Sequence, residues 1–302
     1  MAKRKKQKYS PIQKMRQTEQ NGRRYYELPN PLPILSPEVD IVTPVYGQPE
    51  FLKRMLGSLV SHDAGIPWTM YLVDDLGPER ERVDAVYDLF RRDPRIRVLK
   101  NAKNSGFAAS NNRGFKTGRS PLLLMLNSDV LIRHDNWLAN MAKEFVDDIW
   151  MGSVGARLLF FDEHLEGYED SPIRPPGKIQ HAGVAFNLIG QPYHIFIGWS
   201  KDHPKIIQRR EMNAVTGACL MTRRDLYYQI GGLDESYTIG NFEDVQYCLT
   251  NRLLGRRVVY QPEACLYHYS GGSGNSMTAR FNEQLFQIKC KDLTEYDEWR
   301  YL

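Results

Sequence analysis

Residues 121–130 read PLLLMLNSDV, and they are the most informative part of the sequence. The apolar run 122–126 is followed at once by Asn127, Ser128 and Asp129. A run this short, bounded by turn-forming residues, is typical of a strand buried on both faces of a sheet. Asp129 is therefore predicted at a strand's carboxyl end, the edge of an α/β sheet where ligands bind. The same three polar residues also suit a plain turn, so a purely structural use of Asp129 stays open at this point.

Strand and helix patterns alternate in the segments before this strand. β-Branched and apolar stretches that break at Pro, Gly or Asp are each followed by apolar residues at helical spacing. In chain order, strands are expected within 39–47, 68–77, 95–101 and 121–126, and helices within 49–62, 79–92 and from about Ala108. This alternation predicts an α/β fold with a parallel sheet and right-handed crossovers.

Polar or turn-forming groups follow three of these strands, at 44–47, at Asp74 and Asp75, and at 127–129. No GxGxxG follows the first strand, which disfavours a dinucleotide site, and the chain lacks the GxxxxGK[ST] of a P-loop. Acidic side chains beside an anionic ligand make physical sense when a metal ion lies between them. The pattern predicts a nucleotide pocket that contains a divalent cation.

The composition is that of a soluble globular protein, with 302 residues of which 42% are hydrophobic and 25% charged. No apolar stretch approaches about 20 residues, and the basic N-terminus precedes no apolar core, so neither a membrane span nor a secretory signal is expected. We expect a cytoplasmic protein and leave open whether it attaches peripherally to a membrane. The four cysteines lack CxxC spacing and are expected to be reduced thiols in the core.

Basic charge is concentrated at the N-terminus. Residues 1–24 contain nine Lys and Arg against one Glu, a net charge of +8, whereas the whole chain carries +4. A segment this polar cannot bury enough surface to fold alone, and we therefore expect a flexible arm. A proline-rich lead-in over 25–37 connects this arm to the domain. Contact with nucleic acid or another anionic surface and a solvated tail without a partner both remain open.

A second pair of adjacent acids precedes a predicted helix over 245–254. Asn241 is expected to cap this helix, with Asp244 in its first turn, which would be a structural use. Glu243 and Asp244 would point about 100° apart, so only one of them can serve the cap. A helix N-terminus favours an ionised carboxylate, and a base must be ionised before it can accept a proton. Asp244 is thus a candidate general base.

Four motifs, in order, resemble those of glycosyltransferase family 2, the inverting GT-A enzymes. The stretch KNSGFAASNNRGFKTGRSPLLLMLNSDV is similar to the family's N-x-GFA-x-x-NN-x-G, hydrophobic strand and N-x-D. AVTGACLMTRRDLYYQIGGLDESY resembles its acceptor-side segment, and FEDVQYCLTNRLLGRRVVYQPEACLYHYSGGS its ED block followed by a histidine. KIQHAGV is similar to rhamnosyl- and galactofuranosyl-type members. The resemblance covers roughly Val39 to Ser273.

This resemblance implies a GT-A fold, a Rossmann-like, mostly parallel sheet flanked by helices. Within the region of resemblance we expect a nucleotide-sugar half over 38–130 and an acceptor and catalytic half over 131–275. The composition adds a basic, proline-rich arm over 1–37 before them, and an amphipathic pattern adds a helical tail over 276–302 after them. The implied reaction is inverting transfer of a sugar from a nucleotide-diphosphate sugar to a saccharide or other hydroxyl acceptor, assisted by Mn²⁺ or Mg²⁺. Sugar, nucleotide and acceptor identities are not readable, nor is the oligomeric state.

The resemblance also assigns roles to residues. Asp129 would bind the cation, with His268 as a second contact, and Asn127 stands where the family often has another acid. Asp244 would be the base and Glu243 would orient the acceptor. The residues implied on the nucleotide-sugar side are Pro44, Val45, Tyr46, Asp74, Asp75, Asn104, Gly106, Asn111, Asn112, Asn127, Ser128 and Gly217.

Weaker candidates lie on the acceptor side. His181 in KIQHAG would contact acceptor or donor, although a lone histidine is more often structural. Trp199 would stack on an acceptor sugar, although a place in the core is the simpler interpretation. Two other functions remain open: the same chemistry on a nucleic-acid acceptor such as a hydroxylated base, docked by the basic arm, or a sugar-nucleotide-binding module without catalysis.

Overall fold

Four parallel strands form the N-terminal half of the central sheet. The computed structural model describes residues 17–20, 23–26, 30–163, 174–269 and 276–301. Strand β3 (Val39–Val45) lies between β4 (Trp68–Asp74) and β6 (Leu122–Leu126), and β5 (Ile96–Lys100) pairs with the other side of β4. All three pairings are parallel, which confirms the predicted strands and their direction.

The order of these strands reverses beside β3. The chain adds β4 and β5 on one side of β3 and then crosses to place β6 on the other side. In open α/β sheets, ligands bind beyond the carboxyl ends of the strands at such a reversal. Residues 46–48 and 127–129 follow these two strands, so both loops lie at the edge where the sequence predicted a site.

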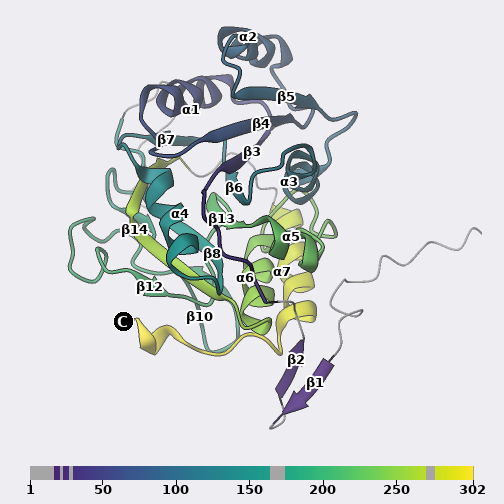
Figure 1. The fold of residues 1–302 in the computed structure, drawn as a ribbon, viewed down its shortest axis with the longest axis vertical. Helices are drawn as coiled ribbons and strands as arrows, with labels where there is room; N and C mark the ends of the chain where they lie inside the picture. Colours follow the sequence, from purple (N-terminus) through teal and green to yellow (C-terminus); the bar gives the residue numbers. More distant parts are fainter. Residues whose placement is uncertain (1–16, 21–22, 27–29, 164–173, 270–275, 302) are drawn as a thin grey trace, which may run out of the picture.

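The C-terminal half extends the same sheet with strands of mixed direction (Figure 1). Strand β13 (Cys219–Arg223) runs antiparallel to both β6 and β8 (Met151–Phe160), and β14 (Arg257–His268) runs parallel to β8. The shorter strands are β7 (Val130–Ile132), β9 (Ile179–His181), β10 (Val184–Phe186), β11 (Pro192–His194) and β12 (Arg210–Glu211). Because β13 pairs with β6, the two halves of the chain form one sheet.

Helices cover both faces of the sheet (Figure 1), and the helices on each face pack over a separate hydrophobic core. One core receives α1 (Pro49–Ser61), α2 (Arg80–Phe90) and α4 (Trp137–Asp147). The other receives α3 (Gly106–Thr117), α5 (Arg224–Ile230), α6 (Glu243–Leu253) and α7 (Ser276–Cys290). Ile41 and Val42 of β3 serve different cores, because neighbouring strand residues point to opposite faces. The predicted α/β class is confirmed.

The described part of the N-terminal segment contains a hairpin that the sequence did not predict. Strands β1 (Gln17–Gln20) and β2 (Arg23–Tyr26) pair with each other in a separate two-stranded sheet. Residues 1–16, where we expected most of the flexible basic arm, lie outside the described residues. The chain ends in a short 3₁₀ turn, η2 (Glu298–Arg300).

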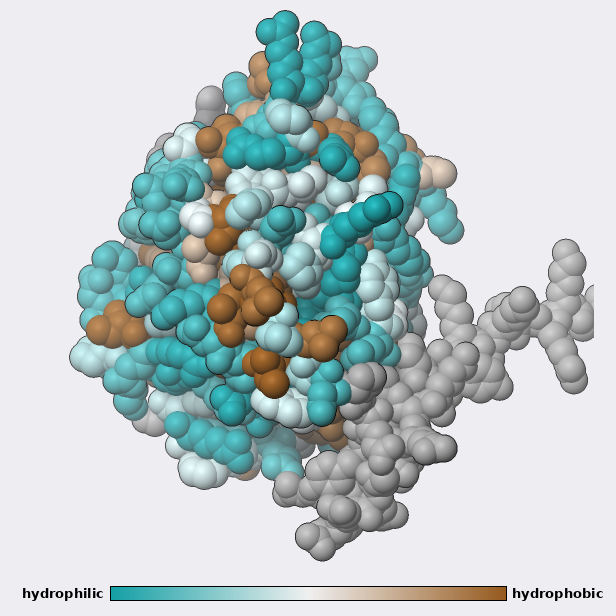
Figure 2. Space-filling view, viewed as in Figure 1, coloured by the Kyte–Doolittle hydropathy of each residue, from teal (hydrophilic) through white to brown (hydrophobic). Residues whose placement is uncertain are grey.

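The molecular face in Figure 2 is mostly hydrophilic, with small separate hydrophobic patches. Over the described ranges, we find no helix with both the length and the apolar character that crossing a bilayer requires. The four cysteines are free and buried, in the core positions that the sequence predicted.

A buried acid ties β3 to the loop that precedes β6. Asp40 accepts hydrogen bonds from the Ser120 N–H at 2.9 Å and the Ser120 hydroxyl at 3.0 Å, and it pairs with Arg224. Its exposed fraction is 2%. Removing one partner of a buried ion pair leaves the other charge uncompensated, which is strongly destabilising.

Asp40→Ala is expected to lower the free energy of unfolding by about 3 kcal/mol, because Arg224 and the Ser120 donors lose their acceptor. Urea unfolding followed by circular dichroism measures this. The control is Asp84→Ala, which breaks the exposed pair between Asp84 Oδ1 and Lys100 Nζ at 2.6 Å and should cost less than about 1 kcal/mol. Equal losses for the two variants would contradict this role of Asp40.

Candidate active site

The loops after β3 and β4 lie in direct backbone contact at the sheet edge. The Asp75 N–H donates to the Val45 carbonyl at 2.8 Å. A Cβ placed on Gly77 would lie 2.2 Å from the nitrogen of Gly47, so a side chain at position 77 would push the two loops apart. The edge is therefore shaped by backbone that only glycine permits.

The residues predicted to hold the base differ in their accessibility. Val45 is fully buried in the core, whereas Pro44 is partly buried and Tyr46 is 49% exposed. Asp74 is buried, accepts the Leu76 N–H at 3.0 Å through Oδ1, and has Oδ2 at 3.6 Å from a guanidinium nitrogen of Arg80. We therefore keep Pro44, Tyr46 and Asp74 in the candidate nucleotide site and assign Val45 to the core beneath this loop.

Asp75 holds the start of α3. Its Oδ1 accepts hydrogen bonds from Asn101 Nδ2 at 2.6 Å and the Ser105 N–H at 2.8 Å, and its Oδ2 accepts the Gly106 N–H at 2.8 Å. The exposed Asn104 also accepts the Gly106 N–H, at 3.2 Å. Because the carboxylate is buried and occupied by these donors, we assign Asp75 to this loop and keep the exposed Asn104 in the candidate site.

The two asparagines of α3 lie inside the protein. Asn111 is fully buried. Asn112 donates to the Leu233 carbonyl at 2.9 Å and to Glu235 at 3.0 Å, and its Oδ1 accepts the Leu233 N–H at 2.9 Å and the Tyr227 hydroxyl. These bonds use every donor and acceptor of the Asn112 amide. We therefore leave Asn112 out of the proposed nucleotide site.

Asp129 and His268 lie side by side. The Nε2 of His268 is 3.1 Å from Asp129 Oδ1 and 3.1 Å from Asn127 Nδ2. The pairing of β7 with β14 places His268 opposite Val130, next to Asp129 in the chain. Ser128 is partly buried between Asn127 and Asp129. The structure thus brings together the two residues that the resemblance implied for the cation.

The hydrogen bonds of Gln180 indicate which nitrogen of His268 faces Asp129. Gln180 Nε2 donates to the His268 carbonyl at 3.1 Å, so its Oε1 is the acceptor 2.6 Å from His268 Nδ1. Nδ1 therefore carries the proton, and in a neutral imidazole Nε2 is an acceptor that faces both the Asn127 amide and Asp129. This arrangement is usual for a metal-binding histidine, whose other nitrogen donates to a neighbouring group.

The donor set is small for a metal site. Within the described residues, no group of three or more His, Cys, Asp and Glu side chains is placed to hold a metal ion. Asp129 and His268 supply one oxygen and one nitrogen ligand, which suits Mn²⁺ or Mg²⁺ provided that other oxygens complete the shell. Diphosphate oxygens of a bound nucleotide are the ligands that this arrangement calls for.

Helix α6 starts from a strained turn. Ile239, Asn241 and Phe242 have φ angles of 64°, 97° and 75°, in the left-handed region that costs energy for residues other than glycine. The N-cap is Phe242, without a side-chain hydrogen bond, so the predicted Asn241 cap is wrong. Strained backbone of this kind clusters at active sites.

The two acids at this helix start are held by the protein interior. Asp244 Oδ2 accepts the Gly217 N–H at 2.6 Å, and Oδ1 accepts the Val245 N–H at 2.8 Å. Glu243 is 4% exposed, and among the residues that the structure describes its buried Oε2 has no hydrogen-bond partner. Burial raises the pKa of both carboxyl groups, and the charge of Asp244 raises the pKa of Glu243 further. A raised pKa makes Asp244 a better proton acceptor near neutral pH.

Gly217 and Ala218 connect Asp244 with the cation side. Gly217 donates to Asp244, and the next residue, Ala218, accepts the Asn127 N–H through its carbonyl at 3.0 Å. Asn127 in turn contacts His268, which contacts Asp129. The sequence predicted Gly217 as a nucleotide-sugar contact, and the structure gives its backbone N–H to Asp244.

Sequence reasoning selected His181 and missed its neighbour Gln180. His181 is fully buried, its Nδ1 donates to the Ala156 carbonyl at 3.1 Å, and its Nε2 accepts the Thr216 N–H at 3.2 Å. Burial holds the His181 pKa well below its usual value, so the ring is neutral. His181 therefore supports the Thr216–Gly217 backbone, while Gln180, pointing to the other side of β9, orients His268. The strand alternation in KIQHAG was the available signal.

Trp199 is 37% exposed and packs edge-to-face against Phe196 and His203, with ring centroids 5.0 and 4.6 Å apart. Its exposed part is available to a ligand, so the acceptor contact remains a prediction.

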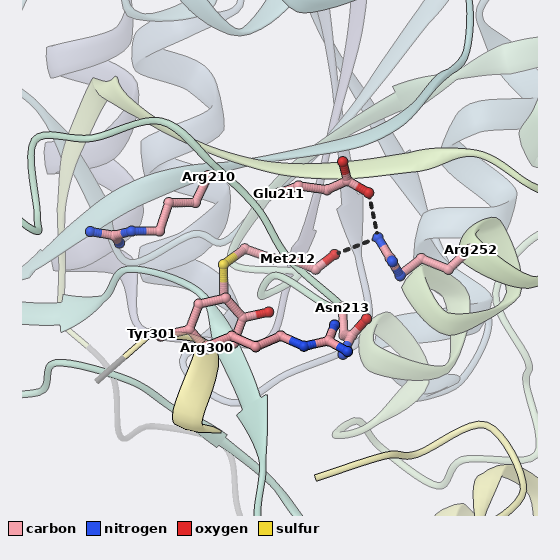
Figure 3. Close-up of a pocket in the computed structure, with 7 residues that line it drawn as sticks. All are labelled: Arg210, Glu211, Met212, Asn213, Arg252, Arg300 and Tyr301. Carbon is pink, nitrogen blue, oxygen red and sulfur yellow. Dashed lines mark hydrogen bonds and ion pairs between the residues drawn. The ribbon is translucent and has the colours of Figure 1, made fainter. Parts of the chain in front are cut away.

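A cavity of about 340 Å³ lies away from these residues, between β12, α6 and the C-terminal residues (Figure 3). It is lined by Arg210, Glu211, Met212, Asn213, Arg252, Arg300 and Tyr301. Arg210 points away from Arg252 in Figure 3, and Arg252 donates to Glu211 at 2.8 Å and to the Met212 carbonyl at 3.2 Å. None of the predicted site residues lines this cavity.

Known proteins share both the sequence pattern and the fold. The sequence model described as Glycosyl transferase family 2 matches residues 40–231. The chain is 28% identical over 263 residues to the uncharacterized protein y4gI of Sinorhizobium fredii. It is 27% identical over 245 residues to the O-antigen biosynthesis protein RfbC of Myxococcus xanthus. These alignments cover 84% and 79% of this chain but only 27% and 18% of the two relatives, so the chain spans a small part of their length.

A solved structure extends the comparison to the fold. The structure of GalNAc-T7 with UDP, GalNAc and Mn²⁺ matches with a TM-score of 0.65 and 14% identity, over 85% of this chain and 49% of that one. At this identity the likeness concerns the fold alone. The matched family region includes Asp129 and Gly217 and ends before Glu243, Asp244 and His268.

Replacing Glu243 by Gln should change how stability depends on pH. The pKa of Glu243 is raised from 4.5 to about 8, so the folded protein keeps a proton that the unfolded chain releases. The contribution of Glu243 to stability should therefore be fully present below about pH 4.5 and be lost as the pH rises toward 8, a decline that the variant lacks. Urea unfolding at pH 5 and pH 8 measures the difference. Glu81→Gln, in the exposed first turn of α2, is the control. An unchanged pH dependence in Glu243→Gln would sink this assignment.

Proposed function

Because the chain belongs to glycosyl transferase family 2, we propose that it transfers a sugar from a nucleotide-diphosphate sugar to an acceptor hydroxyl, with inversion at the anomeric carbon. The proposal rests on one observation. A chain of hydrogen bonds through Gly217, Ala218 and Asn127 connects Asp244 with the Asp129–His268 pair at the same sheet edge. An inverting displacement needs a base for the attacking hydroxyl and a positive charge at the leaving diphosphate. These residues supply the first and can hold the second.

The donor would bind where the strand order reverses. Pro44, Tyr46 and Asp74 would contact the nucleoside, and Asp129 and His268 would hold Mn²⁺ or Mg²⁺. When bound, the cation neutralises charge that gathers on the departing diphosphate. The GalNAc-T7 structure of the same fold contains UDP and Mn²⁺, which supports a donor of this class. Gln180 would keep the lone pair of His268 directed at the cation.

Asp244 would take the proton from the acceptor hydroxyl. The N–H groups of Gly217 and Val245 fix its carboxylate, one on each oxygen, and each oxygen keeps a lone pair for the substrate. Glu243 would orient the acceptor. Its pKa of about 8 leaves it largely protonated at neutral pH, so it can donate a hydrogen bond to the acceptor.

The acceptor we propose is a saccharide. RfbC is described by its name as an O-antigen biosynthesis protein, which supports a saccharide product. Neither the described residues nor the matches above support a nucleic-acid acceptor. A binding module without catalysis would have no physical need for buried acids beside a candidate cation site.

Asp244→Asn is expected to lower kcat by roughly 10² to 10⁴, because the amide cannot accept the hydroxyl proton. Donor binding, measured by calorimetry with a nucleoside diphosphate and Mn²⁺, should stay within a factor of about three. The matched control is Asp225→Asn, whose carboxylate also accepts the next N–H in a first helical turn, in α5. The base assignment would be falsified if the Asp244→Asn protein retained native turnover.

Asp129→Ala is expected to weaken the binding of a nucleoside diphosphate in the presence of Mn²⁺ by at least tenfold, because the cation loses its only protein carboxylate in this proposal. Binding without Mn²⁺ should change little. Isothermal titration with and without the metal measures both. The control is Asp135→Ala, an exposed acid that accepts the Asp63 N–H at 2.9 Å in the loop between β7 and α4. Equal metal dependence in Asp129→Ala and the native protein would argue against this site.

A further inference from the structure

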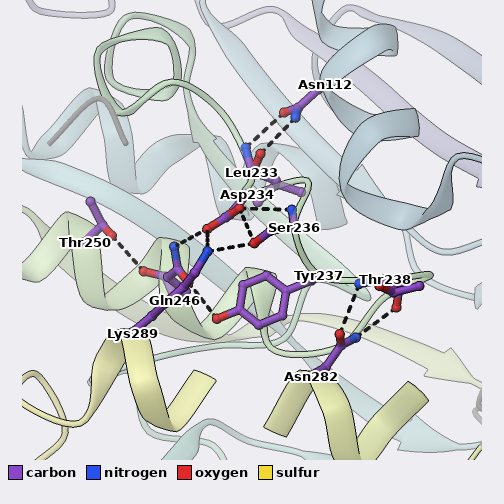
Figure 4. Close-up of polar contacts among 10 residues, drawn as sticks. All are labelled: Asn112, Leu233, Asp234, Ser236, Tyr237, Thr238, Gln246, Thr250, Asn282 and Lys289. Carbon is purple, nitrogen blue, oxygen red and sulfur yellow. Dashed lines mark hydrogen bonds and ion pairs between the residues drawn. The ribbon is translucent and has the colours of Figure 1, made fainter. Parts of the chain in front are cut away.

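Helix α7 lies across the segment that leads into α6 (Figure 4). Residues of α7 contact three successive parts of the segment 233–242. Lys289 reaches Asp234 and, at 2.7 Å, the Ser236 hydroxyl, while Asn282 reaches the backbone at Thr238. This segment ends at the residues that carry the proposed base, so α7 is in a position to fix their geometry.

Asn282 is the most specific of these contacts. Its side chain is fully buried. Nδ2 donates to the carbonyls of Thr238 at 2.9 Å and Gly240 at 2.7 Å, and Oδ1 accepts the Thr238 N–H at 3.0 Å. One amide therefore satisfies three backbone groups of a single turn. No apolar or charged residue of this size offers two donors and an acceptor in that arrangement.

The turn that Asn282 holds is the strained one. Ile239, Asn241 and Phe242 have left-handed φ angles, and such backbone persists only when its surroundings over-determine it. The surroundings on the other side come from α3, where the Phe107 N–H donates to the Ile239 carbonyl at 2.6 Å. The turn is therefore clamped between α3 and α7.

An aromatic contact continues the clamp to the helix start. Phe286 of α7 is fully buried and stacks on Phe242, with ring centroids 5.4 Å apart and an interplanar angle of 29°. Phe242 directly precedes Glu243 and Asp244. The backbone of Gly240 packs against the Glu243 carboxyl group, since a Cβ placed on Gly240 would lie 3.5 Å from Glu243 Oε1. A shift of this turn would therefore move both acids.

We propose that α7 is a positioning element for the catalytic carboxylates, and that Asn282 is its principal positioning residue, assisted by Phe286. The inference rests on the proposed function of Asp244 and extends it. The family match ends at residue 231. The helix that positions the proposed base therefore lies outside the matched region, in the segment that the sequence predicted as a helical tail.

Asn282→Ala is expected to lower kcat roughly 10- to 100-fold and to change the donor KM by less than about threefold, because a displaced base costs chemistry more than donor binding. The acid limb of its pH–kcat profile should also shift, because Asp244 and Glu243 would sit in altered surroundings. Combined with Asp244→Asn, the Asn282→Ala change should have no further effect on the residual turnover, since both act through the same base.

Two further variants keep the test decisive. If Asn282→Ala does not fold, Phe286→Leu takes its place. This variant keeps the core apolar and should also lower kcat. Gln287→Ala is the matched control, because Gln287 lies on the same helix but donates to the Gly190 carbonyl, at 3.2 Å. It should leave kcat within about twofold.

The base assignment of Asp244 and the positioning role of α7 are overturned by different results. An inactive Asp244→Asn together with fully active Asn282→Ala and Phe286→Leu would overturn the positioning role alone. A lowered melting temperature with unchanged kcat and pH profile would do the same. A fully active Asp244→Asn would overturn the base assignment, and the positioning role with it.

Discussion

The antiparallel pairing of β13 with β6 is the constraint on which the rest of the site depends. It sets the start of β13 against the end of β6, where the Ala218 carbonyl accepts the Asn127 N–H. Gly217, one residue earlier, donates to Asp244, and Asn127 leads to His268 and Asp129. Acids that lie far apart in the sequence are thereby brought to one sheet edge, which the proposed base and cation need in order to act on one substrate.

This arrangement is costly to the folded state. Glu243 is buried beside Asp244 with one oxygen unsatisfied, and the turn before them contains three strained residues. Buried unsatisfied groups and left-handed backbone both cost free energy in the folded state, and such features cluster at functional sites. The contacts from α3 and α7 offset the cost and hold the turn in one conformation. The site is thus maintained from elements on either side of it rather than by its own residues.

The sequence predicted the half of the fold that obeys simple periodicity. The strand 122–126 is buried at every residue and the strand 39–45 at every residue but Pro44, and their carboxyl ends lie at one edge as expected. The roles of individual polar residues were harder to predict. Asp75 lies in the expected loop and Asn112 in α3, but both side chains turn inward, and Gln180 was passed over for His181, because hydrogen-bond partners more than 25 residues away decide those orientations. Likewise, no local sequence pattern predicts the hydrogen bond between Asn282 and Thr238.

The most direct test of the central claim is anomalous diffraction from crystals grown with Mn²⁺ and a nucleoside diphosphate. We expect a manganese peak bound by Asp129 Oδ and His268 Nε2, with the diphosphate completing its coordination and the Asp244 carboxylate facing the open side of the diphosphate. A manganese peak elsewhere on the protein, or a nucleotide bound with Asp244 turned away from it, would contradict the account.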